Sequence, residues 1–222
     1  MSTPSSAVDP IATIMVIDDH PLLRRGVRQL LDMEDDLQLI YETGSPQEGI
    51  QQAVALEPDM LLLDMNMPDM SGLETLKHLR DAGYGGRIIM YTVSDQEDDV
   101  VDALRGGADG YLLKDMEPED MVHQLRQAAK GRMVISENLT ALLAQALRNQ
   151  RGASPAPSSA SLTQREKEIL RELSAGMSNK LIARKLGITE GTVKVHVKHL
   201  LKKLHLRSRV EAAVWAVQEG LS

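Results

Sequence analysis

Residues 60–64, MLLLD, join a short apolar run directly to a carboxylate, and such runs recur along the first 130 residues. Apolar runs that predict strands lie at 11–17, 37–41, 60–63, 87–91 and 110–113. A helical pattern follows each of them, at 22–33, 46–56, 72–81, 95–105 and 118–130. Five strand–helix units in alternation predict an α/β domain, with a five-stranded, doubly wound parallel sheet covered by helices on both faces.

Four of these runs end on charged or hydroxyl side chains, which are Asp18, Asp19, Asp64, Thr92 and Lys114. In an open parallel sheet, ligands bind outside the carboxyl ends of the strands, near the point where the strand order reverses. If the order is 2-1-3-4-5, the five side chains share one edge. A single aspartate after a strand is more often a turn former or a helix cap, but five residues at matching strand ends favour a site.

The chemistry of these five side chains suits phosphoryl transfer. Three neighbouring carboxylates repel one another, and Mg²⁺ fits a site of few carboxylates, water and a phosphate oxygen. Lys114 adds a positive charge and Thr92 adds a hydroxyl donor, so both are suited to a phosphoryl group in transfer. Asp64 ends the strand that is central in the proposed order. We therefore predict that Asp64 is the nucleophile and becomes an acyl phosphate.

The last third of the chain has a different pattern. Residues 136–150 predict a helix, and residues 151–161, RGASPAPSSAS, predict a linker because small residues and prolines cannot build a core. No strand pattern remains after it. Thr163 and Glu166 predict a capping box, Ser178 and Thr189 predict two further helix caps, and Gly187 ends the second helix. Residues 161–222 are thus predicted to form an all-α, four-helix domain.

Charge is divided unevenly between the two parts. Residues 161–222 hold 12 Lys and Arg against 6 Asp and Glu, a balance of +6, so the total of −7 leaves −13 for residues 1–160. A basic tail suggests a polyanionic partner, although ordinary scatter of surface charge is the alternative. Lys194, Lys198 and Lys202 recur on one side of the third helix with Val195 among them. A solvated lysine face fits an exposed valine less well than a helix that reads the DNA major groove.

The first part resembles the receiver domain of two-component response regulators, through DD at 18–19, LLLDMNMPDMSG at 61–72, TVS at 92–94 and GADGYLLKD at 107–115. The resemblance implies a flavodoxin-like fold, with phosphorylation of Asp64 by a sensor histidine kinase. The Mg²⁺ ligands that it implies are Asp18, Asp19, Asp64 and the backbone carbonyl of Asn66. It also implies that Thr92 and Lys114 contact the phosphoryl group, and that Tyr111 swings inward with Thr92 on activation.

The second part is similar to the helix-turn-helix domain of the LuxR/NarL family, through LTQREKEIL at 162–170, SNKLIARKL at 178–186 and TVKVHVKHLLKKL at 192–204. The resemblance implies contacts to double-stranded promoter DNA from Lys194, Val195 and Lys198, with Lys202 on the same face. It implies a homodimer that pairs through the last helix, at Val210, Val214 and Val217. The domains expected are a receiver at 1–131, a linker helix and flexible linker at 132–160, and the DNA-binding domain at 161–222.

The remaining expectations concern the cellular compartment and the activity of the protein. The chain has no cysteine, so thiol chemistry and disulfides are excluded, and its start does not read as a secretion signal. No apolar stretch is long enough to cross a membrane, so we expect a cytoplasmic protein with no membrane partner. We expect no enzymatic activity beyond the receiver's own phosphotransfer and dephosphorylation. The stretch VSDQEDDVVDAL at 93–104 further resembles nitrate- or nitrite-responsive regulators of anaerobic respiration genes, with the kinase sensing the anion.

Two other functions remain open at this point. A Mg²⁺-dependent phosphohydrolase would also use an acidic pocket, and it predicts multiple turnover on phosphate esters. A regulator controlled by a diffusible ligand would be expected to have lost one of the five pocket residues. The charge division adds one more expectation, which is that the acidic receiver covers the basic third helix until phosphorylation releases it.

Overall fold

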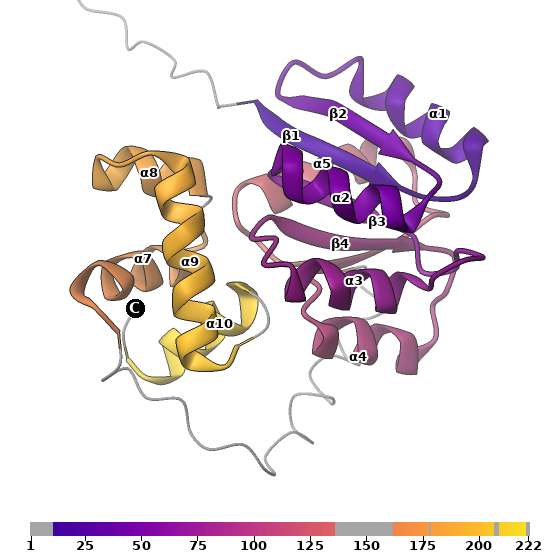
Figure 1. The fold of residues 1–222 in the computed structure, drawn as a ribbon. Coiled ribbons are helices and arrows are strands. Elements are labelled where there is room, and N and C mark those ends of the chain that lie inside the picture. Colours follow the sequence, from indigo (N-terminus) through magenta and orange to yellow (C-terminus); the bar gives the residue numbers. More distant parts are fainter. Residues whose placement is uncertain (1–10, 136–161, 178, 207–208, 221–222) are drawn as a thin grey trace, which may run out of the picture.

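The computed structural model describes residues 11–135, 162–177, 179–206 and 209–220, which form two domains (Figure 1). In the first domain, strands and helices alternate in the order β1 (Ala12–Ile17), α1 (Pro21–Leu31), β2 (Leu37–Thr43), α2 (Pro46–Leu56), β3 (Met60–Leu63), α3 (Gly72–Asp81), β4 (Arg87–Thr92), α4 (Glu97–Gly106), β5 (Gly110–Leu113), α5 (Pro118–Ala129) and β6 (Val134–Ile135). The predicted helix at 136–150, the linker at 151–161 and the Ser178 cap lie outside the described residues.

The strands form one sheet in the order β2-β1-β3-β4-β5-β6, and every pair is parallel. The predicted order of the first five strands is confirmed. The sixth strand was not predicted, because two residues are too few to show a period. In the register, Ile17 is opposite Leu63 and Thr92 is opposite Leu113, so the residues that follow these strands meet at one edge.

Alternation along the strands divides the core between the two faces of the sheet. Met15 and Ile17 pack in the cluster that includes Leu76 of α3 and Val100 of α4, whereas Ile14 and Val16 pack in the cluster that includes Leu125 of α5. Helices α2, α3 and α4 thus cover one face, and α1 and α5 cover the other. Both faces are buried, as the near-continuous apolar runs predict.

The second domain is helical, with α7 (Gln164–Ser174), α8 (Asn179–Leu186), α9 (Glu190–Leu204) and α10 (Arg209–Gln218) around one core. The predicted capping box is confirmed, because the Thr163 hydroxyl accepts from the Glu166 backbone and the Glu166 carboxylate accepts from the Thr163 N–H. Thr189 caps α9 by accepting from the Thr192 N–H. Among the described residues, no helix is long and apolar enough to cross a membrane.

The helical domain lies at the amino ends of the strands, and the arrowheads of the strands point away from it (Figure 1). Lys180 of α8 donates to the carbonyl of Ile11, just before β1, at 3.3 Å. The two backbones also meet directly, because a methyl group on Gly131 would lie 1.2 Å from the carbonyl oxygen of Gly176. The edge where the acidic residues gather is therefore the far edge from the helical domain.

Candidate functional site

At the carboxyl edge of the sheet, Lys114 lies between two buried carboxylates. Its Nζ is 2.8 Å from Oδ2 of Asp18 and 2.9 Å from Oδ1 of Asp64. The side chains of Asp18 and Asp64 are only 1% and 2% exposed, and that of Lys114 is 6% exposed. The strands set this geometry, because the Asp64 N–H donates to the carbonyl of Ile17 and joins the end of β3 to the end of β1.

The two oxygens of Asp64 have different environments. Oδ1 accepts from the Met65 N–H at 2.9 Å as well as contacting Lys114, whereas Oδ2 is buried and has no hydrogen-bond partner among the described residues. Burial raises the pKa of the Asp64 carboxyl, the hydrogen bond from Lys114 lowers it, and the charge of Asp18 raises it again. One oxygen is thus held by donors, and the other is left available to a ligand or an electrophile.

Asp18, Asp19, His20 and Asp64 each place one ligand atom in a group that spans no more than 4.8 Å. Sequence reasoning missed His20, although it directly follows the aspartate pair, and its Nδ1 lies 2.8 Å from Asp19 and 4.0 Å from Oδ2 of Asp64. Three carboxylates, each with a buried oxygen that has no hydrogen-bond partner among the described residues, fit a hard divalent cation. Asn66 lies just beyond Asp64 and is exposed, and ligation by its carbonyl stays a prediction.

Thr92 and Tyr111 are joined through Ser94 in the loop between β4 and α4. The Thr92 hydroxyl accepts from the Ser94 N–H at 3.3 Å, and the Tyr111 hydroxyl donates to the Ser94 carbonyl at 2.9 Å. Tyr111 is fully buried in this structure, and its inward swing on activation stays a prediction. The Ser94 hydroxyl also donates to Asp99 of α4 at 2.5 Å, which ties the loop to that helix.

On α9, the predicted division between a buried side and a polar side is present. Val193, Val197, Leu200 and Leu204 are fully buried in the helical core. Leu201, one turn before Leu204, is only partly buried. Val195 is 52% exposed, and Lys198 and Lys202 are exposed as well, so apolar and cationic groups share the outer side of the helix.

That outer side of α9 faces the receiver domain. Lys194 donates to the carbonyl of Glu57 at 2.8 Å, and its Nζ is 3.7 Å from the Glu57 carboxylate. Lys194, Val195 and Lys198 line a cavity of about 190 Å³, together with receiver residues that include Val54, Gly83 and Tyr84. The receiver thus contacts part of the outer side of α9, through the turns before β3 and β4, and masking of the helix until phosphorylation stays a prediction.

The last helix is described only in part. Val217 of α10 is 56% exposed, whereas the side chains of Val210 and Val214 lie outside the described residues. Pairing of two chains through this helix stays a prediction.

Comparisons with known proteins agree with both domains. Residues 14–126 match the family described as response regulator receiver domain, and residues 160–216 match bacterial regulatory proteins of the luxR family. The nitrate/nitrite response regulator NarL of Escherichia coli K12 is 56% identical over 210 residues, which are 95% of this chain and 97% of NarL. NarP of the same strain is 47% identical over 206 residues, or 93% of this chain and 94% of NarP.

A solved structure extends the likeness to the three-dimensional fold. The response regulator ChrA of a heme-sensing two-component system matches with a TM-score of 0.50 at 32% identity, covering 96% of this chain and 99% of the ChrA chain. The full-length match to such regulators and the match of each half to its own domain family lead to one conclusion. The chain belongs to the LuxR family of two-component response regulators, with a receiver domain joined to a helix-turn-helix domain for transcription regulation.

Proposed function

We propose that this protein takes a phosphoryl group from a sensor histidine kinase onto Asp64 and responds by releasing α9 to bind promoter DNA. The observation that carries the proposal is the position of α9, whose Lys194 contacts Glu57 of the receiver while Val195 and Lys198 line the same interdomain cavity. In the closed arrangement the receiver therefore competes with DNA for Lys194 and lies beside Val195 and Lys198. The names of NarL and NarP suggest nitrate or nitrite as the signal, sensed by the kinase.

The residues of the pocket support the chemical step. The free oxygen of Asp64 attacks the phosphorus of the kinase phosphohistidine, the P–N bond breaks, and the imidazole nitrogen leaves with the electron pair. Lys114 holds the other oxygen of Asp64 and offers its charge to the transferred group, and Thr92, the last residue of β4, accepts from the Lys114 N–H through its carbonyl. Asp18, Asp19 and Asp64 would hold a Mg²⁺ ion, which would supply the positive charge that makes these carboxylates compatible.

Phosphorylation must act on α9 through a change in conformation. Asp59, next to the interdomain contacts, is five residues before Asp64 along β3, which corresponds to about 16 Å. That distance exceeds the Debye length of about 8 Å at physiological ionic strength, so the phosphoryl charge itself has little effect on Lys194. The Thr92–Ser94–Tyr111 hydrogen bonds and the Ser94–Asp99 contact connect the pocket to α4, and we propose that they carry the change.

The closed arrangement contains contacts that oppose it. Burial raises the pKa of the Glu190 carboxyl at the start of α9, and the nearby charge of Asp59 raises it further. The closed arrangement is therefore destabilised when both carboxylates are ionised. Coupling between two sites is typically only about 1–3 kcal/mol, so a modest destabilisation of the closed state makes it easier for phosphorylation to open the protein.

The test uses the full-length chain and DNA recovered from a random library with the phosphorylated protein. Acetyl phosphate and Mg²⁺ should label one site per chain and raise DNA affinity, and Asp64→Asn should block both effects. The proposal fails if the unphosphorylated protein already binds this DNA as tightly as the phosphorylated protein. Continuous turnover of phosphate esters, beyond one phosphoryl group per chain, would favour the hydrolase alternative.

A further inference from the structure

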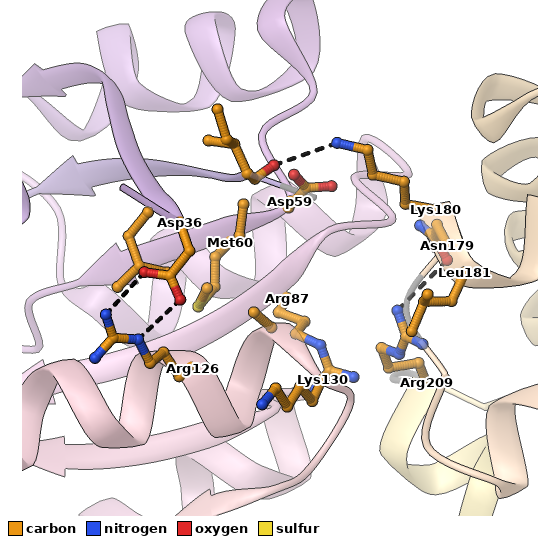
Figure 2. Close-up of a pocket in the computed structure, with 14 residues that line it drawn as sticks. Asp36, Asp59, Met60, Arg87, Arg126, Lys130, Asn179, Lys180, Leu181 and Arg209 are labelled. Atoms are coloured by element: carbon orange, nitrogen blue, oxygen red, sulfur yellow. Dashed lines mark hydrogen bonds and ion pairs between the residues drawn. The ribbon is translucent and has the colours of Figure 1, made fainter. Parts of the chain in front are cut away.

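A second cavity lies between the domains, at the amino ends of β1, β3 and β4, on the side of α8 and α10 (Figure 2). Its volume is about 80 Å³. Cationic side chains dominate its lining, and they are Arg87, Arg126, Lys130, Lys180 and Arg209. Only two carboxylates, Asp36 and Asp59, line it with them. The cavity therefore carries excess positive charge in a place that both domains enclose.

The carboxylates are already engaged by neighbours. Asp36 accepts two hydrogen bonds from Arg126, at 2.8 and 2.9 Å, and these hydrogen bonds are the main cause of its lowered pKa. Asp59 accepts from the N–H and the hydroxyl of Thr13, both at 2.9 Å. Arg126 is thus neutralised within the receiver, whereas Arg87, Lys130, Lys180 and Arg209 face a single carboxylate.

Two of these cations are buried and have no carboxylate partner within the part of the chain that the structure describes. Arg87 is 3% exposed, its Nη1 donates to the Arg132 carbonyl at 3.3 Å, and its Nη2 has no hydrogen-bond partner among the described residues. Arg209 is 7% exposed, and its described acceptors are the neutral oxygens of Asn179 and Met177. Figure 2 shows the guanidinium group of Arg87 extending from β4 toward that of Arg209.

Burial opposes the charge of both groups. It lowers the pKa of the Arg87 guanidinium, and burial followed by the charge of Arg87 lowers the pKa of Arg209; the charge of Asp109 offsets part of both effects. An arginine nevertheless stays charged in proteins. Buried charges are normally paired, so two like charges in one cavity leave a requirement for an anion.

We propose that this interdomain cavity binds a small oxyanion of the phosphate or sulfate type while the domains are closed. A guanidinium group matches such an anion through two parallel N–H donors, and the unpartnered Nη2 of Arg87 supplies one of them. A volume of about 80 Å³ is several times the roughly 10–15 Å³ that one water molecule requires, so the cavity has room for a few heavy atoms. The site is separate from Asp64, which lies at the opposite edge of the sheet.

The anion would favour the resting state. Arg87 and Lys130 come from the receiver, whereas Lys180 and Arg209 come from the DNA-binding domain, so the complete site exists only when the domains are together. A ligand that binds one of two states shifts the population toward that state. Occupation of the cavity therefore keeps α9 against the receiver and lowers the affinity of the unphosphorylated protein for DNA.

Binding is tested on the unphosphorylated full-length chain with inorganic phosphate, in EDTA and at constant ionic strength, by calorimetry and by broadening of the phosphate ³¹P signal. EDTA removes divalent ions, so the acidic pocket at Asp64 does not contribute. We expect one saturable site, and sulfate and nitrate titrations show which oxyanion shape fits best. The absence of saturable binding by all three anions would overturn the proposal.

Variants locate the site. Arg87→Gln and Lys130→Gln should each weaken phosphate binding by about tenfold or more, as expected for loss of a hydrogen bond to a charged group. Lys130 is exposed, so its variant should keep the fold. Arg28→Gln is the matched control, because Arg28 pairs with Glu42 on a surface outside the cavity. Equal phosphate affinity in all three variants would place the anion elsewhere and overturn the assignment.

The link to DNA binding has its own measurement. At constant ionic strength, phosphate should weaken DNA binding by the unphosphorylated wild-type protein and by Arg28→Gln, but not by Lys130→Gln. Phosphate binding without this difference would overturn the role in the resting state, and it would leave phosphorylation at Asp64 unaffected.

Discussion

At the carboxyl edge of the sheet one lysine lies between two buried carboxylates, whereas at the amino edge two buried arginines have no carboxylate partner among the described residues. The first edge holds three carboxylates against one lysine and leaves one oxygen of Asp64 without a hydrogen-bond partner among those residues. The second edge is closed by backbone carbonyls, which accept from Lys194 and Lys180, and by one interdomain ion pair at 3.7 Å among the described residues. The carboxyl edge of the sheet thus forms the reactive site, and the amino edge forms an interface that can separate.

The largest effect should come from the carboxyl edge. Asp64→Asn removes the nucleophilic oxygen while keeping the size of the side chain, so labelling by acetyl phosphate with Mg²⁺ should be abolished. Labelling is measured as a mass increase of the intact chain. Asp69→Asn, which changes an exposed carboxylate in the following loop, serves as the control and should still be labelled. Undiminished labelling of Asp64→Asn would show that another residue accepts the phosphoryl group.

At the amino edge, Gly131→Ala should force the domains apart. A methyl group there would lie 1.2 Å from the Gly176 carbonyl oxygen, which no rotamer change relieves. The unphosphorylated variant should bind DNA more tightly, by about 5- to 150-fold, the usual range of coupling between sites. DNA affinity is measured by fluorescence anisotropy.

The matched control for this variant is Gly176→Ala. Both glycines have positive φ, 101° and 78°, so both substitutions carry backbone strain, but a methyl group on Gly176 meets nothing closer than 3.9 Å. If both variants bind DNA equally well, strain rather than separation of the domains explains the effect.

Lys198 lines the interdomain cavity in the closed state and, by our proposal, contacts DNA in the open state. Lys198→Ala should weaken binding of the phosphorylated protein to its selected DNA by about 1–3 kcal/mol if the lysine reads a base edge. If it contacts only phosphate, the loss should be uniform over all sequences, with a shallower salt dependence. Lys167→Ala on α7 removes the same charge and should leave affinity unchanged. Equal losses in both variants would contradict a specific role for α9.

The sequence predicted the carboxyl edge more completely than the amino edge. Asp64, Thr92 and Lys114 each follow a strand, so the parallel topology alone places them together. Arg87 and Arg209 come from different domains, and their proximity depends on docking that no local period encodes. The charge division predicted contact between the receiver and α9. The interdomain hydrogen bonds, however, are accepted by the backbone carbonyls of Glu57 and Ile11, which a count of charged residues cannot predict.

Two features of the carboxyl edge have no signal in the sequence. His20 follows the aspartate pair, but a lone histidine there does not indicate that its ring joins the group of possible metal ligands. The hydrogen bond from the Tyr111 hydroxyl to the Ser94 carbonyl depends on the shape of a loop, which the sequence pattern does not predict.

Ionisation of Asp64 at the carboxyl edge should also lower the stability of the folded protein in a pH-dependent way. The folded pKa of Asp64 is raised mainly by burial, so ionisation destabilises the folded state. This cost is absent below the unfolded pKa of about 3.9, grows as the pH rises, and is complete above the folded pKa. In EDTA at pH 7, Asp64→Asn should therefore melt at a higher temperature than the wild type, and the difference should vanish near pH 3. A constant difference at every pH would assign it to packing instead.

The smallest change in DNA affinity is expected for Glu57→Gln, which tests how much the interdomain ion pair, rather than the backbone contacts, holds the domains together. Glu57→Gln keeps the backbone carbonyl that accepts from Lys194 and removes only the carboxylate, which is 57% exposed and 3.7 Å from Nζ. Exposed ion pairs contribute about 0–1 kcal/mol, so DNA affinity of the unphosphorylated protein should rise by less than about fivefold, and less still at high salt. Glu42→Gln, on the surface that Arg28 shares, is the control with the same charge change. If Glu57→Gln opens the protein as far as Gly131→Ala does, the closed state depends on that ion pair, and the division of roles between the two edges is wrong. A small, salt-dependent rise would instead show that backbone contacts hold α9 in place, so that only a change in the shape of the receiver can release it.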